Sequence, residues 1–332
     1  MNKRFWMLFL LWCASLLLSF CIGRYPLSVS DILAILSGNP PSEMASAVFF
    51  SIRLPRALLT AVSGGALALS GLAFQNVFLN PLVSPDVLGV TSGASVGAVF
   101  AILFLPAGAL FVQTSAFLCG ILVVVFCIWL AHFVRRDRVV GMILAGIVVG
   151  SLASAVLMLF KFLADPTHEL PAIEYWLMGG FQNANWQQVI VVTAVTVPAG
   201  IVLYLLRFRV RLLSLGDDQT KSLGVSPGRV RLLTIACATL LVSAVVSVAG
   251  VVSWIGLLAP HIVRLMGPKD LNGQTGTVCL CGSILLLLAD LCARSLSGVE
   301  IPVSIFTSLF GAAFLAVLLV RFGRMKKGGG LF

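Results

Sequence analysis

The sequence predicts an all-α, polytopic membrane protein with about ten transmembrane helices, and three observations support this fold class. Of the 332 residues, 59% are apolar and only 10% are charged, whereas soluble proteins carry roughly 25% charged residues. Apolar blocks of transmembrane length recur along the chain, and charged residues, Pro or Gly separate them. Lys and Arg gather in alternate connections between the blocks. Lipid must therefore be the main solvent of this chain.

Ten apolar blocks account for most of the chain, which we read as one transmembrane domain over residues 1–332. The blocks lie near residues 5–22, 54–75, 86–106, 109–133, 139–163, 186–206, 229–249, 251–267, 273–296 and 302–322. At roughly 20 residues per span, they occupy about two-thirds of the chain. The divisions near Leu105-Pro106 and Ala249-Gly250 are hard to place, so nine or eleven spans also fit the pattern.

The first block resembles a signal peptide, because Lys3 and Arg4 precede the apolar stretch 5–22. Cleavage before Cys21 would need a small residue at the preceding position, and Phe20 is bulky. No small-x-small site follows. We therefore expect an uncleaved first span.

No cluster in the sequence indicates a metal site, a disulfide framework or a catalytic centre. The eight cysteines lie in or at the ends of apolar blocks without a C-x-x-C pair, and the three histidines lack ligand spacing. Asp290 is the only acid well inside a span, which weakens a proton-relay mechanism. The phosphate-binding loop motif is absent, so any ATP must act through another subunit. We expect a chain that is not an enzyme and binds no cofactor itself.

The basic residues define an orientation rather than a nucleic-acid surface, because they lie between apolar blocks and not along one face. With the N-terminus in the cytoplasm, 17 of the 22 Lys and Arg fall in cytoplasmic segments. The other five, Arg24, Arg53, Arg56, Lys161 and Arg294, fall on the outer side. This asymmetry predicts that both termini are cytoplasmic.

Two outer connections are too long to be simple turns. They cover residues 23–53 and 164–185. Within the second, the stretch 173–178 is short and amphipathic and is followed by Gly179-Gly180. This pattern predicts a short helix at the outer surface that glycine ends.

The cytoplasmic connection 207–228 is also long. It predicts two short helices, at 212–215 and 217–223, which Gly216 and Gly224 join and end. A charged linker is the simpler alternative. Because the segment is amphipathic and ended by glycine, a protein-docking element is at least as well supported.

Arg53 and Arg56 flank Pro55 at the outer start of the second span. Pro suits the first turn of a helix, where its missing N–H costs nothing. The two arginines either extend to the membrane interface or offer a basic docking point to an acidic partner, and the residues alone favour neither. The turn 80–82 after this span is explained by turn chemistry alone.

Several longer stretches occur together and in a fixed order. They are RLPRALLTAVSGGALALSGLAFQNVFLNPLVSPDVLGVTSGA (53–94), LAGIVVG (144–150), YWLMGGF (175–181), LLSLGDDQTKSLGVSPGRVR (212–231), VSVAGVVSWIGLLAPHIVRLMG (246–267) and LLLADLCAR (286–294). On these stretches the chain resembles the permease family that imports ferric siderophores, haem and vitamin B12. The resemblance covers about residues 25 to 322 and implies the type II ATP-binding-cassette (ABC) importer permease fold.

The resemblance also implies partners. A second permease copy or a paralogue pairs around one pathway in the bilayer, two ABC ATPase subunits lie below, and an extracytoplasmic substrate-binding protein docks above. ATP is used by the ATPase partner. Arg53, Arg56 and Arg294 match positions that receive glutamates from the binding protein.

Other site residues follow from the same resemblance. The ATPase-coupling segment comprises Leu212, Ser214, Leu215, Gly216, Asp217, Asp218, Leu223 and Gly224. Asn80, Leu82, Asp137, Gly141 and Met142 match elements near the cytoplasmic gate, and Tyr175, Trp176 and Met178 match the outer gate region. One departure is that Leu79 stands where the family has a basic residue before Asn80.

We therefore expect an importer permease of the bacterial inner membrane that moves an iron chelate. Ferric siderophore is the cargo expected from the family, and haem and vitamin B12 stay open. The alternative is an ion-coupled secondary transporter or channel, which would work without an ATPase. A membrane-embedded enzyme ranks third, because it would need acids, histidines or serines clustered at one depth.

Overall fold

A computed structural model describes residues 3–134, 138–267, 274–296 and 298–327, and all regular structure within these ranges is helical. Seven of the helices are long and apolar enough to cross a membrane. Three shorter apolar helices, Val90–Phe104, Ile255–Met266 and Val303–Leu318, coincide with the remaining predicted blocks. The all-α, polytopic fold class is therefore confirmed.

The seven long and three shorter apolar helices follow the predicted blocks in order. They are α1 (Lys3–Cys21), α4 (Leu54–Val77), α5 (Val90–Phe104), α6 (Ala109–Ala131), α7 (Arg138–Leu163), α9 (Trp186–Leu212), α11 (Pro227–Ala249), α12 (Ile255–Met266), α13 (Thr275–Ser295) and α14 (Val303–Lys327). Shorter elements connect them: α2 (Val29–Leu36), α3 (Glu43–Ala47), the π-helix η1 (Val48–Arg53), the 3₁₀ turns η2 (Pro85–Leu88) and η3 (Leu213–Leu215), α8 (Glu169–Met178) and α10 (Asp217–Ser222).

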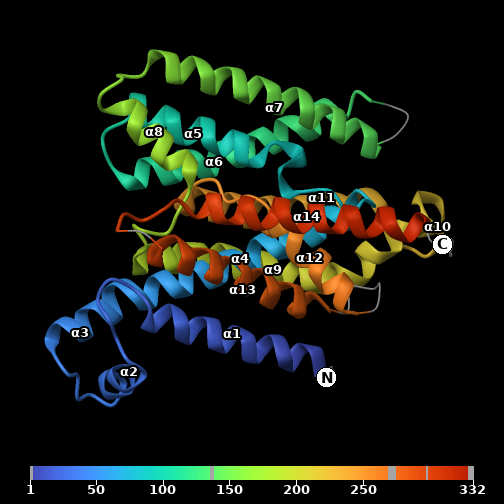
Figure 1. Ribbon diagram of the computed structural model, residues 1–332. Helices are drawn as coiled ribbons and strands as arrows, with labels where there is room; N and C mark the ends of the chain where they lie inside the picture. The colour runs from blue at the N-terminus through green and yellow to red at the C-terminus, as the bar shows by residue number, and fades with distance from the viewer. Residues whose placement is uncertain (1–2, 135–137, 268–273, 297, 328–332) are drawn as a thin grey trace.

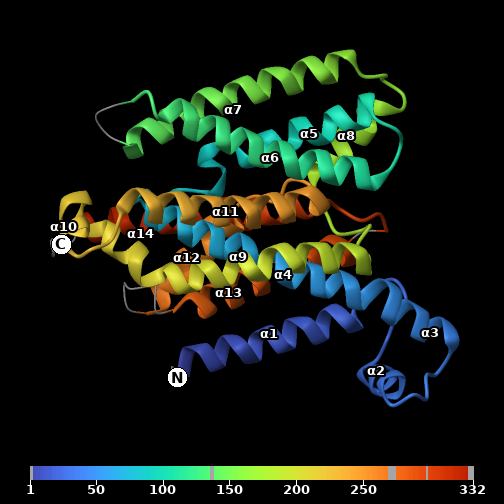
Figure 2. The same cartoon turned by 180° about the vertical axis from the view of Figure 1, so that it is seen from behind.

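The long helices run side by side, so the bundle has two ends (Figure 1). One end carries α2, α3 and α8, and we name it the α8 end. The opposite end carries α10, and we name it the α10 end. The reverse view shows that α1 begins and α14 finishes at the α10 end (Figure 2). Elements far apart in sequence therefore meet at each end.

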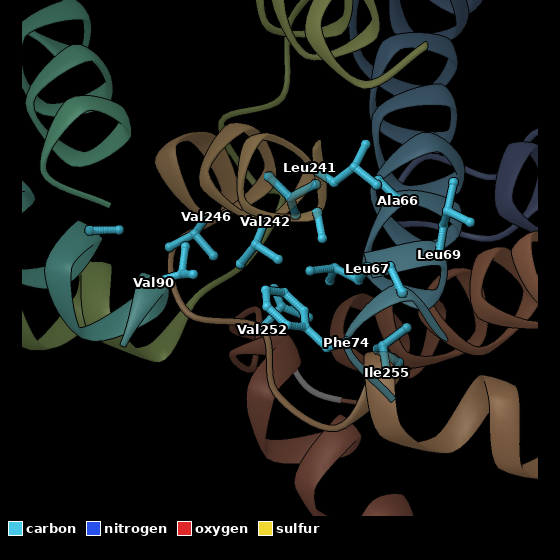
Figure 3. Packing of buried hydrophobic residues seen from close by; sticks show 14 of the residues in the cluster. Ala66, Leu67, Leu69, Phe74, Val90, Leu241, Val242, Val246, Val252 and Ile255 are labelled. Atoms are coloured by element: carbon cyan, nitrogen blue, oxygen red, sulfur yellow. The ribbon is translucent and has the colours of Figure 1, made fainter. Parts of the chain in front are cut away.

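Helix α4 forms the centre of the bundle and packs against α9, α11, α12 and α13. Its glycines allow the closest approaches, because a Cβ at Gly71 would lie 1.8 Å from the carbonyl oxygen of Gly256. A Cβ at Gly64 would lie 2.4 Å from the carbonyl oxygen of Gly282. Around these contacts, fully buried side chains such as Phe74 fill the core between α4 and α11 (Figure 3). The small-residue pattern thus builds close helix pairs.

Residues 43–53 are helical rather than part of an irregular connection. Ser42 begins α3 by accepting a hydrogen bond from the Ala45 N–H, and η1 then runs directly into α4. Pro55 has no N–H to donate and its ring crowds the preceding turn, which accounts for the wide π turn just before it. The predicted outer connection 23–53 is therefore shorter, and the helix that contains the second span is longer.

The third span also begins later than the predicted residue 86. Residues Pro85–Leu88 form η2, and Gly89 follows with φ +78° before α5 starts at Val90. Gly89 packs close to the backbone of Gly150 in α7, since a Cβ there would lie 3.8 Å from the Gly150 nitrogen. Gly89 ends η2 and precedes the first residue of α5. Its backbone lies in the left-handed region, where residues with a Cβ are strained.

Candidate functional site

The predicted coupling segment forms two short helical elements at the α10 end, as the sequence indicates. η3 follows α9 directly, and α10 begins after Gly216. Gly216 has φ +91° and Gly224 has φ +76°, so both turns use backbone conformations that favour glycine. Gly216 therefore joins the two elements and Gly224 ends the second.

The coupling segment is fixed to the bundle through its inner face. Leu213 is fully buried against α9 and α11 side chains, including Leu206 and Val230. The Thr220 hydroxyl oxygen lies 2.7 Å from the carbonyl oxygens of both Leu212 and Gly216, so its one proton is shared between these two acceptors. Asp217 pairs with Arg231 of α11 at 2.7 Å. A displacement of this segment therefore acts directly on α9 and α11.

The opposite face of the segment is exposed and mixed in character. Leu215 and Leu223 are 48% and 58% exposed. Asp218 lies between them in sequence and forms an exposed ion pair with Lys221 at 3.1 Å, and Ser214 is also exposed. Apolar side chains beside charges on an anchored, exposed helical pair suit a protein groove.

Asn80 and Leu82 lie in the turn that follows α4. The Asn80 side-chain oxygen accepts a hydrogen bond from the Leu82 N–H at 2.9 Å, which closes the turn, and Leu79 has φ +52°. Leu82 is largely exposed. Because α4 contacts η3, the helix that carries this turn is packed against the coupling segment.

The predicted gate residues on α7 are partly described. Gly141 is buried, and a Cβ there would lie 2.9 Å from Cβ of Val134. Met142 is buried, and its carbonyl oxygen accepts a hydrogen bond from the Cys127 thiol of α6 at 3.7 Å. The start of α7 is therefore packed on α6. Asp137 lies outside the described residues.

The short helix of the second outer connection is α8, which starts at Glu169 rather than at the predicted residue 173. The preceding turn is built on Asp165, which accepts hydrogen bonds from the Thr167 hydroxyl and from the Thr167 and His168 N–H groups. These donors stabilise the carboxylate and hold the pKa of Asp165 below its usual range. A 2.8 Å ion pair between Lys161 and Glu174 then ties α8 to α7.

Tyr175, Trp176 and Met178 share the last turns of α8. Tyr175 and Met178 are exposed, and Trp176 is half-buried. Tyr175 and Trp176 line a cavity of about 250 Å³ together with Gln113, Gln182, Gln188 and Ser247. Two of the three predicted outer gate residues, Tyr175 and Trp176, therefore border a space with neutral polar groups at the α8 end.

The chain after α8 is attached to two other helices. The Gly180 N–H donates to the Ala249 carbonyl oxygen at the end of α11 at 2.8 Å. The Val303 N–H at the start of α14 donates to the Gly179 carbonyl oxygen at 3.1 Å, and the Ser304 hydroxyl donates to the Met178 carbonyl oxygen. The position of α8 is therefore coupled to the starting turn of α14.

The three predicted docking arginines lie at the α8 end, and all are buried, with exposed fractions of 3% for Arg53, 6% for Arg56 and 8% for Arg294. Arg53 donates to the carbonyl oxygens of Phe20 and Tyr25. The hydrogen-bond and ion-pair partners of these side chains lie within the chain. Their role in docking stays a prediction.

Arg56 and Arg294 share one buried carboxylate. Arg56 binds Asp290 through two of its nitrogens, the shorter contact being 2.8 Å, and Arg294 lies 3.5 Å from the same carboxylate. Arg294 also donates to the carbonyl and hydroxyl oxygens of Ser19. Asp290 is fully buried, so its charge depends on these arginines.

Arg56 has a second carboxylate partner, Glu300, which no sequence pattern indicated. Its remaining terminal nitrogen binds both carboxylate oxygens of Glu300, at 3.0 and 3.1 Å. An acid inside a span requires a cation, and Arg294 four residues after Asp290 was visible in the sequence. Asp290 also pairs with Arg56, which is 234 residues away in the sequence. This pairing, and the contact between Glu300 and Arg56, can be found only from the three-dimensional fold.

Two exposed hydroxyls lie in the middle of α7. Ser151 and Ser154 donate to the carbonyl oxygens of Ile147 and Gly150 at 2.8 and 2.9 Å, and both residues are exposed. Polar groups in spans usually face protein or a water-filled pathway rather than lipid. This face of α7 is therefore a candidate for a pathway or a partner contact.

Comparisons with known proteins find relatives over most of the chain. Residues 9–321 match the FecCD transport family. The molybdate import system permease protein MolB of Haemophilus influenzae is 37% identical over 94% of this chain and 93% of its own. A probable iron chelatin transport system permease protein of Helicobacter pylori is 34% identical over 85% of each chain. The solved inward-facing structure of a putative metal-chelate type ABC transporter covers 96% of this chain and 99% of its own, with 34% identity and a TM-score of 0.88.

Proposed function

The chain belongs to the FecCD transport family and is a multi-pass permease subunit of an ABC importer, and we propose that it moves an iron chelate across the bacterial inner membrane. The exposed face of η3 and α10 carries the ATP-driven part of this proposal, because it offers a site for a separate ATPase. That subunit would supply the energy that a permease itself does not generate.

The coupling proposal is supported by the two faces of the same segment. Leu215 and Leu223 are available to an ATPase groove, while Asp217 and Leu213 join the segment to α11 and α9. ATP-driven movement of the ATPase pair would then be transmitted to the bundle as a rigid-body displacement. Deletion of residues 217–223 should release the ATPase during co-purification, whereas retention at normal yield would contradict this assignment.

The proposed orientation places the α10 end in the cytoplasm, with both termini, and the α8 end outside. The charge asymmetry of the connections supports it. A second copy or a paralogue would face the exposed hydroxyls of α7 across the pathway. Asn80, Leu82 and Met142 would then lie toward the cytoplasmic gate, and Tyr175 would lie toward the outer gate.

An extracytoplasmic binding protein would dock on the α8 end. The arginines Arg53, Arg56 and Arg294 are the proposed receptors for its acidic residues, and each is held in place by an internal partner. Such charge pairs would contribute to the association rate and to specificity more than to affinity.

The iron-chelate cargo is supported by the Helicobacter pylori relative, a probable iron chelatin transport system permease protein. Molybdate is the second candidate, because the Haemophilus influenzae relative is a molybdate permease with 37% identity. Both cargoes are anionic or chelated metals that a binding protein would select.

Uptake into proteoliposomes tests the function. The permease, its ATPase and its binding protein are reconstituted together and supplied with radiolabelled ferric siderophore, haem, vitamin B12 or molybdate. We expect uptake of one cargo that requires ATP hydrolysis. Uptake by the permease alone on an ion gradient would instead support a secondary transporter.

A further inference from the structure

We propose that Glu300 is a positioning residue that occupies Arg56 until a partner carboxylate replaces it, and that this exchange loosens the segment that holds the end of α8. The inference rests on the proposed docking of an acidic partner at the α8 end. It assigns to Glu300 a role in regulating that site.

Glu300 is one of two carboxylates that face the arginines of this cluster, and Arg53 lies within electrostatic range of Arg294 as well. Arg56 and Arg294 supply two positive charges, and Asp290 and Glu300 supply two negative charges. Without Glu300, two buried guanidiniums would share the single carboxylate of Asp290. Such a site favours an incoming carboxylate, because an uncompensated buried charge is costly.

Exposure identifies which member of the cluster can leave. The Asp290 side chain is fully buried and that of Arg56 is 7% exposed, whereas the Glu300 side chain is 28% exposed. Glu300 therefore covers Arg56 on the side that a partner would approach. An acidic side chain from outside would reach this guanidinium by taking the place of Glu300, the more exposed of its two carboxylate partners.

The backbone around Glu300 connects the cluster to α8. The Ile301 N–H donates to the Ala293 carbonyl oxygen of α13 at 3.0 Å, and two residues later Val303 binds the Gly179 carbonyl oxygen. Ser304 binds the Met178 carbonyl oxygen. Residues 298–304, which we name the strap, thus run from the Arg56 contact to the last turn of α8. Loss of the Arg56 contact removes the ion-pair anchor of this strap, while the Arg24 guanidinium still donates to the Gly298 carbonyl oxygen at 2.5 Å.

Hydrogen exchange of the purified permease tests directly whether the Glu300–Arg56 contact holds the strap. Glu300→Gln keeps the shape and removes the charge, and we expect about tenfold faster amide exchange in residues 298–304 and 176–180. Glu43→Gln removes another acid at the α8 end, an exposed one in α3, and should leave the strap unchanged. Glu300→Asp keeps the charge on a shorter side chain and should give an intermediate rate. Unchanged strap exchange in Glu300→Gln overturns the proposal, and so does equally faster exchange in all helices, which would indicate general destabilisation.

A second measurement tests the link to docking. The measurement uses nanodiscs that contain the permease and its ATPase without the binding protein. Glu300→Gln should raise basal ATP hydrolysis about threefold there, because the strap is loosened even though no binding protein is docked. Unchanged hydrolysis in a variant with a loosened strap overturns the docking role of Glu300. Wild-type permease could instead show no ATP-dependent uptake while Glu300→Gln still speeds amide hydrogen exchange in the strap. That result would contradict the proposed function but would still support the role of Glu300 in holding the strap.

Discussion

The carboxylate of Asp217 lies 2.7 Å from the guanidinium of Arg231, so the first turn of α10 is fixed to α11. The Arg231 side chain is 10% exposed and that of Asp217 is 41% exposed, which makes this pair more protected from solvent than the neighbouring Lys221–Asp218 pair. A protected contact between the coupling segment and a central helix is where force would pass from an ATPase to the bundle.

Arg231→Met should therefore lower ATP-driven uptake about fivefold, since a partly protected ion pair contributes about 1 kcal/mol. Accumulation in the membrane should stay near the wild-type level, because Leu213 and Thr220 still hold the segment. Lys221→Met removes the exposed pair and serves as the control, with uptake expected to change less than about twofold. Equal losses in both variants would argue against transmission through Arg231.

Gly71→Ala should strongly destabilise the protein, because its Cβ would lie 1.8 Å from the carbonyl oxygen of Gly256. Overpacking of this kind typically costs about 1–3 kcal/mol, and here backbone must move. Gly65→Ala is the matched control on the same helix, since its Cβ would meet the Cys279 carbonyl oxygen at an ordinary 3.5 Å. Thermal unfolding in detergent should show a lower Tm for the first variant and little change for the second. A similar Tm for both would contradict the close α4–α12 contact.

The spans and the coupling segment could be predicted from local patterns. Apolar block length determines a span, and the glycines at 216 and 224 determine where the short helices end. The arginine cluster could not be predicted, because Arg56 meets Asp290 and Glu300 only after α4, α13 and the strap come together. Likewise, nothing in the sequence before Pro55 indicates that residues 43–53 continue the helix, since the π turn depends on backbone geometry.

Asp290→Asn should destabilise the protein, because Arg56 and Arg294 would lose the carboxylate that they share. Removing one member of a buried ion pair costs about 3–5 kcal/mol. The double variant Asp290→Asn with Arg294→Met leaves Arg56 paired with Glu300, and it should recover part of this loss. The Tm of each purified variant provides the measurement, and Asp218→Asn, at an exposed acid, is the control. A double variant less stable than the single one would show that Arg294 is not balanced by Asp290.

Enlarging a side chain on the hydroxyl-bearing face of α7 should impair transport without unfolding the protein. Ser154→Leu replaces an exposed hydroxyl, so packing inside the subunit is unchanged and the Tm should stay near that of wild type. If this face lines the pathway or contacts a partner subunit, uptake should fall about tenfold, because the added side chain meets groups absent from the isolated chain. Leu122→Phe enlarges an exposed apolar side chain of α6 and is the control, with normal uptake expected where lipid covers the surface. Normal uptake by Ser154→Leu, or an equal loss in both variants, would remove α7 from the pathway.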